Sequence, residues 1–248
     1  MNADFLNGKT ALITGAAKRL GAALALALAA KGARVVLHYN RAEAEARALA
    51  QTIADAGGVA DVVQADLAAE GTVPRVMEEA LSKTNHLDIL INNASIFEEI
   101  TFADTTDRAI QENMSVNAIA PLLLSRCFAA QGRPGAIVNM IDTMVMDYDR
   151  KHLPYHLSKR TLQTLTRVMA VEFAPDIRVN AVAPGLILPP AGKGKDYLEQ
   201  LASSNPLHCH GGPEDIVKAV FYLLGAGFVT GQTLFVDGGR HLRGSMYE

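Results

Sequence analysis

Short apolar runs, separated by stretches with helical periodicity, recur along the whole chain. Most of these runs are almost continuously apolar, as in ALIT, VVLH, DILI and AIVNM. Strands covered by helices on both faces have this pattern, whereas a half-exposed strand alternates apolar and polar residues. The runs predict seven strands, at residues 10–14, 33–38, 60–64, 88–92, 136–140, 178–182 and 233–236.

Helical patterns fill the intervals between these strands. They span residues 20–31, 42–56, 71–83, 106–130, 154–173 and 214–224. Regular alternation of strand and helix implies crossover units and a parallel sheet. No repeat, low-complexity tract or charged linker divides the sequence. We therefore expect one α/β domain over residues 1–248, a doubly wound Rossmann fold with a seven-stranded parallel sheet flanked by helices.

Two segments, residues 142–153 and 185–206, lack a regular pattern. Each follows a predicted strand, at the sheet edge where ligands bind in open α/β folds. Pro189 and Pro190 argue against regular structure at the start of the second segment. We expect both segments to be loops that shape a pocket, with residues 185–206 contacting substrate. The alternative is that they are surface connections without function.

Composition and charge exclude several classes of protein. Hydrophobic residues make up 49% of the chain and the net charge is −3, so nothing favours general binding to nucleic acid or anionic lipid. The sequence has neither a stretch long enough to cross a membrane nor a signal-peptide pattern. Cys127 and Cys209 are distant thiols, which favours a reducing cytoplasm. His208, Cys209 and His210 are adjacent and lack a partner cluster, so we expect no metal site.

A glycine-rich turn, TGAAKRLG at residues 14–21, follows the first predicted strand and opens a helix. Glycine lets the backbone approach a pyrophosphate closely, and a helix N-terminus offers unpaired N–H groups with partial positive charge. The turn therefore predicts a dinucleotide phosphate site. A tight turn without a ligand is the alternative.

The end of the second predicted strand indicates which dinucleotide is bound. An Asp or Glu at this place usually meets a free ribose 2′-hydroxyl. Here the sequence is HYNR, residues 38–41, and the first acid is Glu43. Arg41, with Lys18 and Arg19, supplies donors suited to a 2′-phosphate. NADPH is therefore favoured over NADH, unless these cations are merely solvated.

A tyrosine and a lysine four residues apart open the helix after the fifth predicted strand. Tyr155 and Lys159 therefore lie on one helix face. A phenol has a free pKa of about 10, and a nearby cation stabilises the phenolate, which brings proton transfer closer to neutral pH. Their position at the expected cofactor edge favours a catalytic pair over a surface cation packed near a ring.

These motifs together resemble the short-chain dehydrogenase/reductase family. The turn at residues 14–21 is similar to the family's TGxxxGxG turn, and NNAS at residues 92–95 to its NNAG segment. Asn117, Asp142, Tyr155 and Lys159 follow the order of the family's Asn, Ser, Tyr, Lys tetrad, with Asp142 at the serine position. Together with HYNR, NNASIF and the terminal DGGRHLR, this aspartate resembles the pteridine reductases, above all the dihydromonapterin reductases that also reduce dihydrofolate.

The resemblance implies reduction of a dihydropterin (dihydromonapterin, dihydrobiopterin or dihydrofolate) to its tetrahydro form. Hydride would pass from NADPH to C6 of a C6=N5 imine, with a proton reaching N5. Asp142 and Tyr155 would form the proton relay, Lys159 would bind the ribose and tune Tyr155, and Asn117 would order a water that feeds Lys159. A flat pterin would stack on Phe97.

The expected cofactor-binding residues, from the turn and from the family's motifs, are Gly15, Lys18, Arg19, Leu20, Gly21, His38, Asn40, Arg41, Asp66, Leu67, Asn93, Ala94, Ser95, Tyr155, Lys159, Pro184, Gly185 and Leu186. The expected substrate-binding residues are Arg19, Ser95, Phe97, Asp142 and Tyr155. The resemblance also implies a homotetramer, with helices 106–130 and 154–173 at the interfaces and the segment 240–248 near a neighbour's site.

Two other functions stay open. One is a carbonyl or 3-oxoacyl reductase on the same fold, which Asp142 in place of a serine disfavours. The other is a non-catalytic NADPH-binding sensor, which the retention of Asn117, Tyr155 and Lys159 disfavours.

Overall fold

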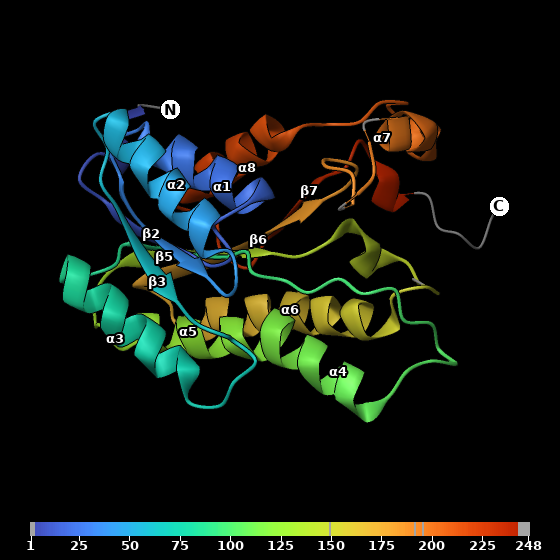
Figure 1. Ribbon diagram of the computed structural model, residues 1–248, viewed down its shortest axis with the longest axis horizontal. Helices are drawn as coiled ribbons and strands as arrows, with labels where there is room; N and C mark the ends of the chain where they lie inside the picture. The colour runs from blue at the N-terminus through green and yellow to red at the C-terminus, as the bar shows by residue number, and fades with distance from the viewer. Residues whose placement is uncertain (1–2, 149, 191, 195, 243–248) are drawn as a thin grey trace.

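The computed structural model describes residues 3–148, 150–190, 192–194 and 196–242. Its strands form one parallel sheet, as predicted, and each boundary lies within two residues of the expected position (Figure 1). The strands are β1 (Thr10–Ile13), β2 (Arg34–Tyr39), β3 (Ala60–Gln64), β4 (Ile89–Asn92), β5 (Gly135–Met140), β6 (Ile177–Pro184) and β7 (Thr233–Val236).

The strand order is β3-β2-β1-β4-β5-β6-β7, so the direction of winding reverses between β1 and β4. In doubly wound sheets this reversal opens a crevice at the carboxyl ends of the two central strands, where ligands bind. The predicted Rossmann fold is confirmed. The turn at residues 14–21 lies at this crevice, because it begins where β1 ends.

Helices cover both faces of the sheet (Figure 1). On one face lie α1 (Arg19–Ala29), α2 (Glu43–Asp55) and α8 (Pro213–Gly225), and on the other lie α3 (Thr72–Thr84), α4 (Asp107–Met114), α5 (Ala120–Ala129) and α6 (Leu153–Glu172). Successive strand residues point to opposite faces, so Ile13 enters the first core and Leu12 the second. Both side chains are fully buried, which explains the continuous apolar runs.

Three segments differ from the predicted elements. The helix expected at 106–130 is α4 and α5 joined by one π-helical turn, Ser115–Ile119. The loop expected at 142–153 contains a 3-10 turn, Thr143–Met146, and the loop expected at 185–206 contains the short helix α7 (Asp196–Leu201) and a 3-10 turn, Ala202–Ser204. Such short elements carry too few residues for a periodic signal.

Two further 3-10 turns lie near the ends of the described chain, at Ala3–Leu6 and Arg240–Leu242. The rest of the predicted C-terminal segment, residues 243–248, and positions 191 and 195 of the predicted substrate loop lie outside the described residues. Within the described part of the chain, no helix combines the length and the apolar character needed to cross a membrane.

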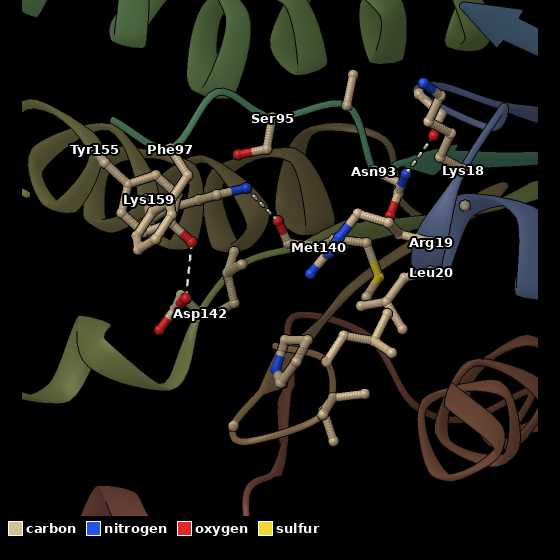
Figure 2. A pocket seen from close by; sticks show the side chains of 18 residues that line it. Lys18, Arg19, Leu20, Asn93, Ser95, Phe97, Met140, Asp142, Tyr155 and Lys159 are labelled. Carbon is tan, nitrogen blue, oxygen red and sulfur yellow. Dashed lines mark hydrogen bonds between the residues drawn. The ribbon is translucent and has the colours of Figure 1, made fainter. Parts of the chain in front are cut away.

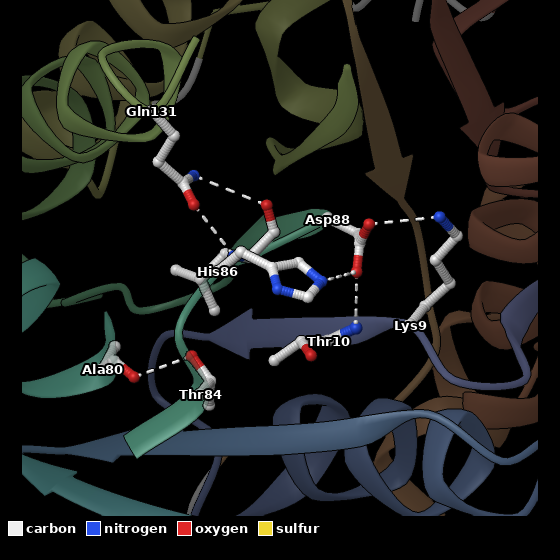
Figure 3. Close-up of polar contacts among 8 residues, drawn as sticks. Lys9, Thr10, Ala80, Thr84, His86, Asp88 and Gln131 are labelled. Atoms are coloured by element: carbon white, nitrogen blue, oxygen red, sulfur yellow. Dashed lines mark hydrogen bonds and ion pairs between the residues drawn. The ribbon is translucent and has the colours of Figure 1, made fainter. Parts of the chain in front are cut away.

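Polar contacts fasten the sheet at the edge opposite the crevice (Figure 3). The Asp88 carboxylate accepts hydrogen bonds from the backbone N–H of Thr10, at 2.9 Å, and from Lys9 Nζ, at 3.1 Å. Gln131, just after α5, binds both the N–H and the C=O of Leu87. These contacts join β1 and the end of α5 to the residues that precede β4. They lie away from the carboxyl edge, where ligands bind in such sheets.

Candidate active site

Two adjoining cavities follow the carboxyl edge of the sheet. The first, of about 400 Å³, lies between the glycine-rich turn, the ends of β5 and β6, and the start of α6 (Figure 2). The second, of about 650 Å³, continues past the ends of β2 and β3. The cavities share Gly15, Lys18, Ala94 and Ser95, so they form one elongated site.

Most of the predicted site residues line this elongated site. The first cavity is lined by Gly15, Lys18, Arg19, Leu20, Gly21, Asn93, Ala94, Ser95, Phe97, Asp142, Tyr155, Lys159, Pro184 and Gly185, and the second adds His38, Asn40, Arg41, Asp66 and Leu67. One predicted cofactor residue, Leu186, lines neither cavity. It is buried and lines a separate cavity, whereas its neighbour Ile187 lines the first. Asn117 is also absent from the lining, because it is fully buried behind it.

Glycines let the turn at residues 14–21 pack closely against its surroundings. Gly15 has a φ of +61°, and a Cβ there would lie 2.9 Å from the backbone of Ala94. A Cβ on Gly21 would overlap the carbonyl oxygen of Gly15. Arg19 also adopts a positive φ, +57°, although it is not a glycine. Its guanidinium donates a hydrogen bond to the carbonyl of Pro189, at 2.8 Å, which links the turn to the loop after β6.

His38 supports the turn from within the sheet. Its Nδ1 accepts a hydrogen bond from the N–H of Gly15, and its Nε2 donates to the carbonyl of Ala65, both at 3.2 Å. Burial lowers the pKa of His38 to about 4, so the ring is neutral at physiological pH. The position of the turn is therefore fixed relative to the ends of β2 and β3.

Three cations border the elongated site. Lys18 forms an ion pair with Glu45 of α2, at 2.5 Å, and Arg19 is bound to Pro189. Arg41 lines the second cavity near Asn40. Phosphate groups suit this surface, because cations and the N-terminus of α1 converge on it.

Asp142 and Tyr155 meet in the first cavity (Figure 2). The Tyr155 hydroxyl donates a hydrogen bond to Asp142 Oδ2, at 2.7 Å, and the N–H of Met144 donates to Oδ1, at 2.8 Å. Burial raises the pKa of the Asp142 carboxyl, although these hydrogen bonds and the charge of Lys159 act in the opposite direction. The carboxyl and the phenol therefore lie within hydrogen-bonding distance, close enough for proton transfer between them.

Lys159 lies one turn further along α6 and is only 3% exposed. Its Nζ donates a hydrogen bond to the carbonyl of Met140, at 2.7 Å, and lies 5.7 Å from the centre of the Tyr155 ring. Burial lowers the pKa of Lys159 to about 8, and the negative charge of Asp142 opposes that shift. Met140 was not predicted, since a backbone carbonyl has no signature in the sequence.

Asn117 holds the segment that follows β4. Its Oδ1 accepts hydrogen bonds from the N–H of Ile96 and the hydroxyl of Ser95, and its Nδ2 donates to the carbonyl of Ile96 and to Ser158 Oγ. These protein groups use the hydrogen-bonding capacity of the amide. Asn117 lies in the π-helical turn between α4 and α5. A water relay through Asn117 to Lys159 stays a prediction.

Phe97 bounds the first cavity beside the phenol. Its ring stacks on that of His152, with centroids 4.1 Å apart, and meets the Tyr155 ring nearly at right angles, at 4.7 Å. It remains 52% exposed. The structure thus brings together the aromatic ring, the phenol and the carboxylate that the sequence selected. The described residues include no group of three or more His, Cys, Asp or Glu side chains able to hold a metal ion.

A doubly wound sheet with a glycine-rich turn after its first strand and a buried Tyr–Lys pair defines a dinucleotide-dependent oxidoreductase as the class. A protein-family model described as Enoyl-(Acyl carrier protein) reductase matches residues 15–241. The chain belongs to the short-chain dehydrogenase/reductase family, as the sequence motifs predicted.

Its relatives act on more than one kind of substrate. Pteridine reductase 1 of Leishmania tarentolae is 32% identical, over 94% of this chain and 96% of the relative. The granaticin polyketide synthase putative ketoacyl reductase 2 of Streptomyces violaceoruber is also 32% identical, over 98% of this chain and 100% of the relative. The structure of FolM alternative dihydrofolate reductase 1 from Brucella canis, complexed with NADP, matches with a TM-score of 0.91 and 34% identity, covering 97% of this chain and 96% of that one. The chemistry of the family is thus shared among these relatives, but their substrates differ.

Proposed function

We propose that this protein uses NADPH to reduce a dihydropterin, a class that includes dihydromonapterin, dihydrobiopterin and dihydrofolate. The hydrogen bond between Tyr155 and Asp142, at 2.7 Å beside Phe97, is the observation that carries the proposal. A carbonyl reductase of this family has a serine hydroxyl where this chain has the Asp142 carboxyl. A carboxyl instead accepts hydrogen bonds from amino and ring N–H groups, which a pterin offers.

The residues around the elongated site fit NADPH. Bound there, NADPH supplies the hydride that reduces the substrate. Gly15 and Gly21 leave room for a pyrophosphate against the turn, and Arg41 and Lys18 present cations to a 2′-phosphate. The NADP in the Brucella relative supports this assignment.

The Asp142–Tyr155 pair provides the proton. Because burial raises the pKa of Asp142, its carboxyl retains a proton to higher pH than a free aspartic acid does. The Tyr155 hydroxyl, bound to that carboxyl, can donate its proton to a substrate nitrogen and recover one from Asp142. Lys159 stabilises the transient phenolate, since its ammonium lies beside the ring.

Phe97 offers an aromatic face to a flat bicyclic substrate. Stacking of this kind is attractive for planar heterocycles and orients them without specific hydrogen bonds. Pteridine reductase 1 and alternative dihydrofolate reductase 1, by their names, act on pterin and folate substrates, and both resemble this chain over nearly its whole length.

The second candidate is reduction of a ketone or a 3-oxoacyl thioester. The similarity to the granaticin ketoacyl reductase favours it, because the identity equals that of the pteridine reductase. Asp142 disfavours it, since a ketone oxygen only accepts hydrogen bonds, and a carboxyl can donate one only in its protonated form, whereas the family's serine hydroxyl always has a hydrogen to donate.

The deciding experiment measures NADPH oxidation with dihydromonapterin, dihydrobiopterin, dihydrofolate and a 3-oxoacyl thioester. We expect turnover of at least one dihydropterin and little turnover of the thioester. Asp142→Ser, which restores the family's usual residue, should lower kcat for the pterin by about 100-fold or more, the loss typical of a removed acid–base group. Turnover of the thioester alone, or full pterin activity in Asp142→Ser, would contradict the proposal.

Cytoplasmic location and the homotetramer implied by the family resemblance belong to the same proposal. Helices at 106–130 and 154–173 would form the interfaces. Light scattering on the purified protein measures its mass in solution, and a monomeric mass would contradict the tetramer.

A further inference from the structure

One end of α6 contacts Phe97 with two aromatic rings. His152 directly precedes the helix and stacks on Phe97 at 4.1 Å, with 16° between the ring planes. Tyr155 lies in the first turn and meets Phe97 at 4.7 Å and 78°. His152 is the N-cap residue and Tyr155 follows three residues later, and both rings reach the same partner.

The backbone on either side of Phe97 is also held. Before it, both the N–H and the C=O of Ile96 are bound by Asn117. After it, Ile100 pairs with His152 in an isolated parallel bridge, and the N–H of Leu153 donates to the carbonyl of Ile100, at 3.1 Å. The backbone of the segment that carries Phe97 is thus fixed at two points. The orientation of the Phe97 ring therefore depends on the contacts of its side chain.

The stacked imidazole covers one part of the Phe97 ring and leaves another part open. Phe97 lines the first cavity and is half exposed, while the His152 ring lies parallel to it. An aromatic ring that is already supported on one face loses less freedom when a flat ligand stacks on the remaining surface. This arrangement suits a planar bicyclic ring better than an acyclic ketone.

We propose that His152 is a positioning residue that holds Phe97 as the stacking wall for a planar heteroaromatic substrate. The inference rests on the proposed pterin function and extends it to a residue outside the cavity lining. His152 contributes through Phe97, so it affects substrate binding more than proton transfer or cofactor binding.

The test compares His152→Ala, His152→Leu and His152→Phe in steady-state assays with NADPH and the dihydropterin that the wild-type protein reduces. Removal of the ring in the first two variants should raise KM for the pterin by about 3- to 10-fold, the range of one aromatic pair. Both kcat and KM for NADPH should stay close to wild type. His152→Phe keeps a stacking ring and should restore KM to within about twofold of wild type.

Phe102→Ala is the matched control, because Phe102 lies on the same segment but is 84% exposed. This variant should leave KM for the pterin unchanged. Any one of three results would overturn the positioning role: an unchanged KM in His152→Leu, a loss of kcat with constant KM, or no rescue by His152→Phe. In each case pterin turnover by the wild-type protein would leave the proposed function intact. Absence of pterin turnover in the wild-type protein would instead refute the proposed function, and the inference with it.

Discussion

Three ionisable side chains of unlike chemistry meet at the start of α6, where Tyr155 and Lys159 are buried and Asp142 is partly buried. Asp142, Tyr155 and Lys159 are linked by a hydrogen bond at 2.7 Å and a cation–ring contact at 5.7 Å. Burial disfavours the charged forms, raising the pKa of Asp142 and lowering that of Lys159. These opposite shifts bring the pKa values of Asp142 and Lys159 closer together. Groups with pKa values near neutrality are suited to proton transfer at neutral pH.

The lowered pKa of Lys159 predicts a pH dependence of catalysis. Lys159 is charged below about pH 8 and loses its charge above it, so stabilisation of the Tyr155 phenolate declines with rising pH. We expect kcat for the pterin to fall above about pH 8. The Lys159→Arg variant should not show this fall, because the guanidinium keeps its charge. The test compares the shapes of the pH profiles, so the absolute kcat of the variant does not matter. A wild-type kcat that does not decline in this range would contradict the assignment.

The same shift affects folding stability. Between about pH 8 and the ordinary value of 10.5, the unfolded chain binds a proton at Lys159 that the folded protein does not. The contribution of Lys159 to the free energy of unfolding therefore rises with pH through this window. The contribution of Lys159 to kcat falls over the same range.

Short local elements give the site its shape. The π-helical turn between α4 and α5 contains Asn117, which binds the segment bearing Phe97. The turn at residues 14–21 joins β1 to α1 and is held by His38 from β2. The start of α6 supplies Tyr155 and Lys159 from one face. Each of these elements is placed by the sheet, so the sheet sets the distances between side chains far apart in sequence.

The first turn of α2 provides a test of cofactor recognition. Glu45 pairs with Lys18, and Glu43 pairs with Arg47 on the same helix. Lys18 lines the elongated site, so Glu45 competes with any phosphate for its ammonium. Glu45→Gln should tighten NADPH binding by about two- to fivefold, the range of an exposed ion pair, and tighten NADH binding less.

Glu43→Gln is the control, since it removes the same charge from the same turn without releasing Lys18. Direct titration of the protein with each dinucleotide measures both affinities. Equal gains from the two substitutions would show that only net charge matters, and would remove the specific role of Glu45.

The two edges of the sheet serve different purposes across the molecule. The carboxyl edge holds the cavities, whereas the opposite edge is fastened by Asp88 and its partners Lys9 and Thr10. Asp88→Asn should therefore lower the free energy of unfolding by about 1–3 kcal/mol, as expected when a partly buried charged hydrogen-bond partner is weakened. Denaturant unfolding measures this loss. The kinetic constants should stay at wild-type values, and a kinetic defect without a loss of stability would contradict this division.

Much of this architecture could be predicted from the sequence. The seven strands, their parallel arrangement and the family membership were predicted correctly. Asp142, Tyr155 and Phe97 were expected to converge, and they do. The π-turn within the predicted helix 106–130 was missed, because a single turn of five residues is too short to give a periodic signal of its own. Leu186 was predicted to bind the cofactor and lines a neighbouring cavity, whereas Ile187 lines the first cavity; spacing alone does not say which of two neighbours faces a cavity.

The sequence by itself determined the fold class, the glycine-rich turn and the placing of Tyr155 and Lys159 on one helix face, because apolar periodicity, glycine spacing and an i, i+4 interval are local properties of the chain. Only the tertiary structure decided that Lys159 binds the carbonyl of Met140, that Asn117 holds Ile96, and that His152 stacks on Phe97. These contacts join segments distant in sequence, and several use backbone groups that every residue possesses. Their partners are therefore set by how the strands order themselves in the sheet, not by any local pattern of residues.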